Sequence, residues 1–154
     1  MKDEDSHRVR HATITLERAY KSTPERLFSA LSNAEERKTW DAPDEGWVTT
    51  ELTQDVREGG AESFRFGPEG DPRFHGESTY AHVAPGRSLV TAGVMKENDV
   101  MISATIATYE ILPDPMGVRL VVTDQTAYFG ASDTPEEREM GWSVILDNLG
   151  AYLG

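Results

Sequence analysis

An aspartate stands at the end of an apolar row in the C-terminal half of the chain. Asp124 continues the alternation of Val118, Leu120 and Val122, so a strand here turns all four side chains to one face. A carboxylate at the end of a core-facing row suits a pocket acid or base, or an anchor for a ligand hydroxyl. It equally suits a group that bonds the backbone where the strand leaves the sheet. Both interpretations of Asp124 stay open.

An imidazole and a second carboxylate lie further upstream, separated by one residue. In a strand, His75 and Glu77 share a face, where the carboxylate can orient the ring as a general base. The competing interpretation is a solvent-facing pair in an acidic protein. The candidate catalytic residues are therefore Asp124, Glu77 and His75.

A third carboxylate alternates with aromatic residues. Glu62, Phe64 and Phe66 share one strand face. If that face is the concave one, Glu62 lies among aromatic rings. Otherwise it is a solvated residue at the start of a strand.

Larger side chains supply candidate walls for a pocket. Trp40 and Trp142 fall on helical stripes and are expected in the core, while Met95 flanks a hairpin and Tyr128 carries a donor on an apolar body. The predicted ligand-lining residues are Trp40, Phe64, Phe66, Met95, Tyr128 and Trp142, with Asp124 and Glu77 as polar anchors.

Several kinds of chemistry lack the residues they need. The chain has no cysteine, which excludes thiolate metal sites, disulfides and a cysteine nucleophile. His75 and Glu77 supply only two metal ligands, so we expect no metal. The sequence contains no G-x-S-x-G, no P-loop and no G-x-G-x-x-G, so no cofactor is implied.

The charge balance excludes other partners. Against 27 acidic residues stand 15 basic ones, a formal net charge of −12. Binding to a phosphate backbone or an anionic membrane surface needs clustered lysine and arginine, so neither nucleic acid nor membrane is an expected partner. No apolar run approaches the length of a membrane span, and the first ten residues lack the apolar core of a signal peptide. We expect a soluble cytoplasmic protein.

Apolar periodicity and turn signals predict one α+β domain. Residues 1–11 are expected to be a disordered tail and residues 12–154 the domain. Thr134 and Pro135 form the start of a long helix with an amphipathic stripe. The expected elements are strands at 11–20, 47–54, 61–66, 73–83, 88–95, 100–112 and 118–127, short helices from residue 24 and over 34–40, and a long helix from 135 to 154.

This order predicts a sheet that encloses a helix. Hairpin-length connections make consecutive strands antiparallel, and the C-terminal helix is the large partner available to cover one face. A strongly twisted seven-stranded sheet curling round one helix leaves a space between them, which is a usual place for a ligand cavity.

Five stretches in the expected order carry a family resemblance. They are STPERLFSALSNAEERKTW at 22–40, DVREGG at 55–60, HGESTYAHVAPGRSLVTAG at 75–93, VRLVVTDQTAYFGASD at 118–133 and GWSVILDNLGAYL at 141–153. They resemble the START-like (SRPBCC) superfamily, within it the group named for the activator of heat-shock protein 90 ATPase, C-terminal-domain type. The resemblance implies a helix-grip fold whose cavity is lined by the segment near Trp40 and by the long helix. Many relatives have His at the position of Asp124.

Three functional hypotheses follow. The first is a protein that binds a small apolar or aromatic molecule between sheet and long helix. The second is a cyclase or dehydratase-like enzyme in which Asp124, Glu77 and His75 do acid–base work. The third, drawn from the resemblance, is an interaction domain that stimulates a chaperone ATPase. A homodimer through the sheet edge or exposed aromatic residues remains an open partner hypothesis.

Overall fold

The computed structural model describes residues 8–154, and in this part of the chain the predicted α+β helix-grip architecture is confirmed. No helix among these residues is both long enough and apolar enough to cross a membrane. The elements are β1 (Arg10–Tyr20), α2 (Pro24–Ser32), α3 (Ala34–Trp40), β2 (Trp47–Gln54), β3 (Ala61–Pro68), β4 (Phe74–Ala84), β5 (Ser88–Glu97), β6 (Val100–Asp114), β7 (Gly117–Tyr128) and α4 (Pro135–Leu153).

The first strand begins earlier than predicted. β1 includes Arg10 and His11, which pair with Tyr128 and Ala127 of β7. The last two residues of the segment predicted as a tail therefore belong to the sheet, because β7 is long enough to offer them partners. Most of the remaining segment falls outside the described residues.

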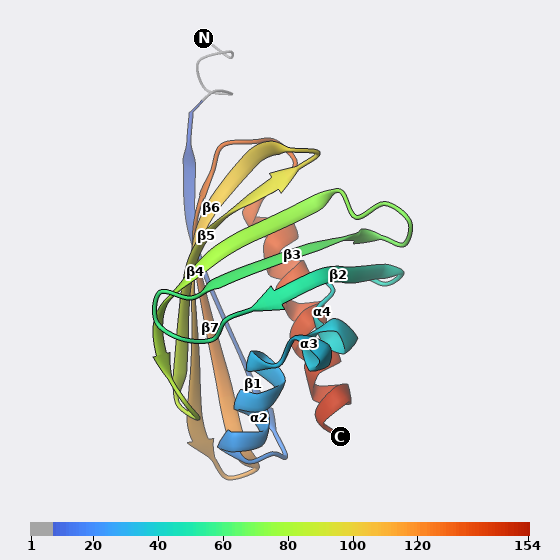
Figure 1. Cartoon of the computed structure of the whole chain (residues 1–154). Helices are drawn as coiled ribbons and strands as arrows, with labels where there is room; N and C mark the ends of the chain where they lie inside the picture. Colours follow the sequence, from blue (N-terminus) through green and yellow to red (C-terminus); the bar gives the residue numbers. More distant parts are fainter. Residues whose placement is uncertain (1–7) are drawn as a thin grey trace.

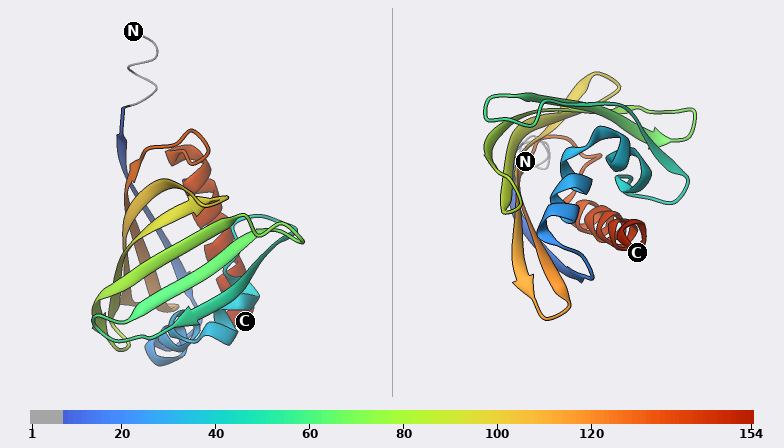
Figure 2. Two further views of the ribbon diagram at one scale, coloured as in Figure 1. Left: turned by 45° about the horizontal axis from the view of Figure 1, so that its top comes forward. Right: turned by 60° about the horizontal axis from the view of Figure 1, so that its bottom comes forward.

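The seven strands form one antiparallel sheet in the order β1-β7-β6-β5-β4-β3-β2. Each strand from β2 to β6 pairs with the next strand along the chain, while β1 pairs with β7. The sheet curves strongly, and α4 lies along its concave side with α2 and α3 near the C-terminal end of α4 (Figure 1). In the right panel of Figure 2, where the bottom of the view in Figure 1 is turned forward, the sheet curves around the three helices.

The long helix α4 begins with a cap and is tied to the first strand. The hydroxyl of Thr134 accepts a hydrogen bond from the backbone N–H of Glu137 at 3.2 Å, and Pro135 follows at the first helical position, so α4 begins where the sequence predicted. Further along α4, the hydroxyl of Tyr20 on β1 donates to the carbonyl of Leu146 at 2.7 Å. This bond holds the helix against the first strand.

Strand register separates an inner face from an outer one. Asp124 pairs with Ile14 and Ala107 and is buried, while its neighbour Gln125 is exposed. The inner face thus continues the row predicted from the alternation of apolar residues. The buried apolar core behind it comprises Tyr20, Leu27, Ala30, Leu31, Trp40, Tyr80, Leu89, Ile111, Val118, Leu120, Val122, Leu146 and Leu149.

Candidate functional site

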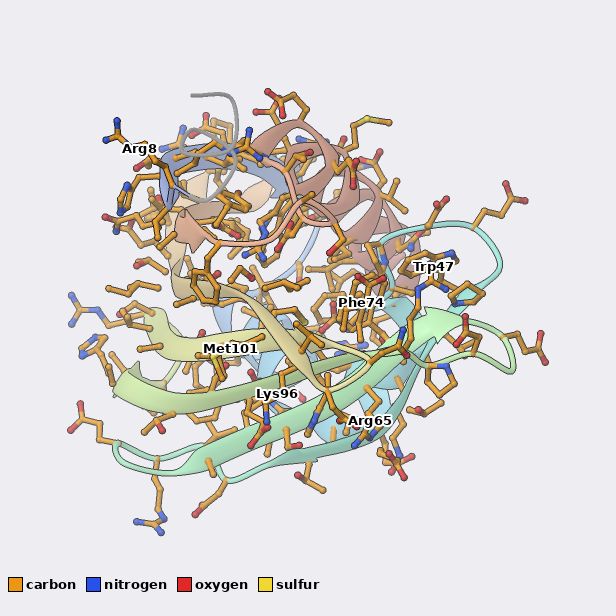
Figure 3. The ribbon with its side chains drawn as sticks, turned by 90° about the horizontal axis from the view of Figure 1, so that it is seen from above. Arg8, Trp47, Arg65, Phe74, Lys96 and Met101 are labelled. Atoms are coloured by element: carbon orange, nitrogen blue, oxygen red, sulfur yellow. The ribbon has the colours of Figure 1, made fainter. Side chains whose placement is uncertain are left out.

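Four aromatic side chains form a continuous stack on the inner face of the sheet, and we call Trp47, Phe64, Phe66 and Phe74 the aromatic ladder. Ring centroids are 5.8 Å apart between Phe64 and Phe66, 5.2 Å between Phe66 and Phe74, and 5.6 Å between Phe74 and Trp47. Trp47 and Phe74 lie side by side at one end of the sheet (Figure 3). All four rings are only partly buried, so the ladder presents aromatic surface to solvent.

A glycine gives the ladder its closest approach to the sheet. Phe64 pairs with Gly76 of β4, and a Cβ at Gly76 would overlap the Phe64 ring. The far edge of the ring therefore lies directly over the backbone of β4. Met95 of β5 pairs with Gly76 on the other side and borders the ladder on the same face.

A buried ion-pair network lies beyond the deep end of the ladder. We call Arg37, Asp41, Glu62 and Tyr80 the Arg37 cluster. Arg37 of α3 pairs with Glu62, and its Nη2 lies 2.6 Å from Asp41 Oδ2, while the Tyr80 hydroxyl donates to Glu62 at 3.0 Å. Burial alone would lower the pKa of Arg37, but Glu62 and Asp41 raise that pKa well above its ordinary value. The guanidinium therefore carries a permanent charge.

The position of Glu62 decides between its two predicted interpretations. Its side chain is 7% exposed and ion-paired, so the prediction of a solvated residue at the start of a strand is wrong. Strand β3 starts at Ala61, yet α3 covers this end of the inner face and removes Glu62 from water. Glu62 instead accepts a hydrogen bond from the Tyr80 hydroxyl, and the Arg37 guanidinium that it binds lies 5.8 Å from the centroid of Phe64.

A small cavity adjoins the Arg37 cluster. It encloses about 10 Å³, enough for about one water molecule. Trp40 lines it, is 3% exposed, and has an indole N–H without a hydrogen-bond partner in residues 8–154. Burial raises the pKa of the Tyr109 hydroxyl well above its ordinary value, so that group stays protonated. The lining residues are Leu31, Arg37, Trp40, Glu62, Tyr80, Leu89, Thr91 and Tyr109.

A second polar network closes the space beside the first turns of α4. We call Asp124, Thr126, Asp133, Arg138 and Trp142 the Arg138 cluster. Asp124 Oδ2 accepts hydrogen bonds from the Trp142 indole at 2.8 Å and from Arg138 at 3.3 Å, and Asp124 Oδ1 accepts one from Thr126. Arg138 also pairs with Asp133. Although burial opposes its charge, the hydrogen bond and charge of Asp133, together with Asp124, raise the pKa of Arg138.

Hydroxyl groups complete the contacts of Arg138. Ser103 accepts from its Nη2 at 2.9 Å and Thr105 from its Nη1 at 2.6 Å. Its guanidinium carbon also lies 5.4 Å from the ring centroid of Tyr128, where burial raises the pKa of the Tyr128 hydroxyl to about 12. That hydroxyl is buried and, like the Trp40 indole, has no hydrogen-bond partner in the described part of the chain.

Two aromatic rings connect the clusters. Tyr109, which lines the small cavity, packs edge-on against Trp142 of the Arg138 cluster, with ring centroids 5.9 Å apart. Aromatic and polar groups therefore run without a break from the Arg37 cluster to the start of α4.

The structure separates the three candidate catalytic residues. His75 and Glu77 belong to the outer face, since Gly76 between them meets the ladder on the inner face. There His75 Nε2 lies 3.0 Å from Ser63 Oγ, and Glu77 pairs with Lys96 at 3.1 Å, which lowers the pKa of Glu77. Asp124 lies on the inner face with the predicted ligand-lining residues. His75 and Glu77 thus share a face with each other but not with Asp124.

Neither arginine was predicted from the sequence as part of the site. Arg37 lies three residues before Trp40, and Arg138 lies four residues before Trp142. Positions three or four apart share a helix face. An arginine at that distance from a tryptophan expected in the core should therefore face the core as well. This spacing could have indicated that Arg37 and Arg138 are buried. Their two guanidinium groups occupy part of the space in which the sequence predicts a ligand cavity.

A larger hollow lies elsewhere. It measures about 350 Å³ and is lined by residues from the end of β1, from the C-terminal half of α4 and by Met116. None of the predicted ligand-lining residues borders it. In residues 8–154 no group of three histidine, aspartate or glutamate side chains is arranged to hold a metal ion.

The architecture defines a helix-grip protein, with a polar and aromatic inner face between the curved sheet and its long helix. Comparison with protein families then places the chain. It belongs to the family described as Activator of Hsp90 ATPase homolog 1-like protein, whose profile matches residues 21–154. No curated protein matches the chain significantly.

Solved structures agree with this placement. The Mll3558 protein of Rhizobium loti is 32% identical, with a TM-score of 0.83 over 96% of this chain and 100% of its own. A protein of Rhizobium leguminosarum is 28% identical, also with a TM-score of 0.83, over 95% of this chain and 96% of its own. DynU16, a protein in the dynemicin biosynthetic locus, shares the fold at 14% identity and a TM-score of 0.68, over 92% of this chain and 46% of its own.

Proposed function

We propose that this protein binds a small, planar, apolar or aromatic molecule on the inner face of the sheet, against the aromatic ladder. The observation that carries the proposal is the ladder itself. Four stacked rings on the concave face remain partly exposed, whereas aromatic side chains that serve only as core are covered. Apolar walls with a few placed polar groups are the usual composition of a small-molecule site.

Polar groups beyond the Phe64 end of the ladder supply orientation. The Arg37 cluster adjoins Phe64, and Tyr109 connects it to Trp142 of the Arg138 cluster. A ligand lying along the ladder therefore meets apolar rings over its body and hydrogen-bonding groups at its deep end. Trp40, Met95, Tyr128 and Trp142 remain proposed ligand contacts together with Phe64 and Phe66.

The geometry favours binding over acid–base catalysis. Asp124 accepts hydrogen bonds from Trp142, Arg138 and Thr126, which leaves it poorly placed to take a proton from a substrate. His75 and Glu77 lie on the outer face, so they supply no second group to Asp124. An Asp124→Asn variant separates the two hypotheses, because conversion of a substrate collapses in an enzyme and a binding protein loses only part of its affinity.

Binding is tested with N-phenyl-1-naphthylamine, an uncharged dye that fluoresces in apolar surroundings. Phe66→Ala removes the centre of the ladder, and we expect about tenfold weaker binding, since an aromatic contact contributes roughly 0.5–1.5 kcal/mol beyond its buried area. Ile106→Ala is the matched control, because Ile106 is 47% exposed on the outer face. Equal affinity in both variants, or no binding by the unmodified protein, would overturn the proposal.

The family description supports a second candidate, stimulation of a chaperone ATPase. Val100 and Met101 at the start of β6 and Phe129 after β7 are large, exposed apolar side chains, and the backbone N–H of Phe129 donates to the carbonyl of Ile102 beside them. Exposed apolar groups of this kind suit a protein partner. The ATPase rate of a purified Hsp90-type chaperone, measured with and without the protein, tests this candidate, and an unchanged rate removes it.

A further inference from the structure

A side chain that lines the cavity beside the Arg37 cluster carries an unpaired donor. The indole N–H of Trp40 is buried and lacks a hydrogen-bond partner in residues 8–154. A buried donor without a partner is destabilising, because it has given up its hydrogen bond to water. Native proteins satisfy such groups with an acceptor, and the cavity that Trp40 lines has room for one oxygen atom.

Hydroxyl groups surround the same space. Thr91 and Tyr109 line the cavity with Trp40, and both side chains can donate. Burial keeps the Tyr109 hydroxyl protonated far above neutral pH. The cavity is therefore rich in uncharged donors and suits an acceptor.

The charge of the cluster limits which acceptor fits. Arg37 already faces two carboxylates, Glu62 and Asp41, so the cluster has one positive and two negative charges. An anionic group in the cavity would meet a guanidinium whose charge is already compensated and a neighbouring carboxylate. Electrostatic repulsion of this kind is strong where water is excluded. An uncharged oxygen avoids the repulsion.

The cavity also lies where a ladder ligand would end. Arg37 both lines the cavity and lies 5.8 Å from the centroid of Phe64, the ring at the deep end of the ladder. We propose, building on the proposed function, that the ligand is an uncharged aromatic molecule whose leading carbonyl or hydroxyl oxygen occupies this cavity and accepts the Trp40 indole hydrogen bond. The aromatic body then rests on the ladder.

Three probes of nearly equal shape test the proposal by isothermal titration calorimetry at pH 7.5. They are 2-acetonaphthone, which has an uncharged carbonyl, 2-ethylnaphthalene, which has none, and 2-naphthoate, which is an anion. We expect the ketone to bind about fivefold tighter than the hydrocarbon, a difference of about 1 kcal/mol that matches one added hydrogen bond, and the naphthoate to bind weakest. Equal affinity of ketone and hydrocarbon, or tightest binding of the naphthoate, overturns the proposal.

Variants locate the acceptor. Trp40→Phe removes the indole N–H and keeps an aromatic ring, so the preference for the ketone should disappear while affinity for 2-ethylnaphthalene stays. Tyr109→Phe removes one hydroxyl at minimal change of shape and should reduce the preference, which guards against a folding defect in the first variant. Tyr128→Phe removes another unpaired buried donor and tests an alternative position of the acceptor. Ile106→Ala on the outer face is the control that keeps the preference.

Two outcomes distinguish failure of this inference from failure of the proposed function. Loss of the ketone preference in Tyr128→Phe but not in Trp40→Phe overturns the assigned position, although the proposed function survives. Absence of binding by all three probes contradicts the proposed function itself, and with it this inference.

Discussion

The Arg37 and Arg138 clusters have the same charges in different surroundings. Each joins one arginine to two carboxylates, one of which, Glu62 or Asp124, lies on the inner face. A cavity adjoins Arg37 and Glu62, which are 8% and 7% exposed, and Asp41 is 19% exposed. Arg138 is 13% exposed, and its partners Asp124 and Asp133 are 2% and 14% exposed. Hydroxyls of β6 and β7 also contact Arg138.

This difference indicates that the Arg138 cluster stabilises the fold, whereas the surroundings of Arg37 suit ligand recognition. At Arg138, protein hydroxyls occupy the remaining donors of the guanidinium, so the cluster fixes α4 to β6 and β7. An unpaired buried donor lies near each cluster, the Tyr128 hydroxyl at Arg138 and the Trp40 indole at Arg37, but Trp40 also lines a small cavity. Similar charges therefore hold the helix at Arg138 and border a space for a ligand atom at Arg37.

Replacing Arg37 should have the largest effect on stability. Arg37→Met leaves Glu62 buried without its ion-pair partner, and we expect the free energy of unfolding to fall by about 3–5 kcal/mol. Urea denaturation followed by circular dichroism measures this fall. The double variant Arg37→Met with Glu62→Leu should recover part of the loss, because it removes both charges. Simple additivity of the two single variants would contradict this account of the cluster.

Replacing Arg138 should cost less. Arg138→Met leaves Asp124 with the Trp142 and Thr126 hydrogen bonds, and Asp133 lies near the surface where water can reach it. We expect the free energy of unfolding to fall by about 1–2 kcal/mol in the same assay. A loss equal to or larger than that of Arg37→Met would mean that the two clusters do not differ as described.

The smallest effect is expected at Tyr128, and it depends on pH. Its hydroxyl has no partner in residues 8–154, so Tyr128→Phe should leave stability at pH 7 almost unchanged. In the folded protein burial raises its pKa from 10 to about 12, so its stabilisation is present below pH 10 and is lost as the pH rises toward 12. The melting temperature should therefore fall less steeply between pH 8 and 12 for Tyr128→Phe than for the unmodified protein. Parallel curves for both proteins would contradict the assignment.

Most of the fold could be predicted because its signals are local. Alternation, turn residues and helix caps each act within a few residues, and they placed all seven strands and three helices. The start of β1 could not be predicted in this way, since its pairing with β7 depends on residues far along the chain.

The candidate site could be predicted only in part. Parity correctly placed Asp124 on the inner face, because the row before it is apolar. Parity also grouped His75 with Glu77, but it does not state which side of a sheet is concave, and the pair lies on the outer one. The burial of Arg37 was not predicted, because arginine is rarely buried and because its partner Glu62 lies 25 residues further along the chain.

The return of β1 to the far side of the sheet also governs when the protein can fold. Arg10 pairs with Tyr128 and Tyr20 with Val118, so the first strand made is completed by the last. At about 5–20 residues per second of synthesis, β1 waits on the order of ten seconds for its partner. The hydrogen bond from Tyr20 to Leu146 comes later still. Until β7 has been synthesised, β1 has no partner strand, so the sheet is completed only near the end of translation.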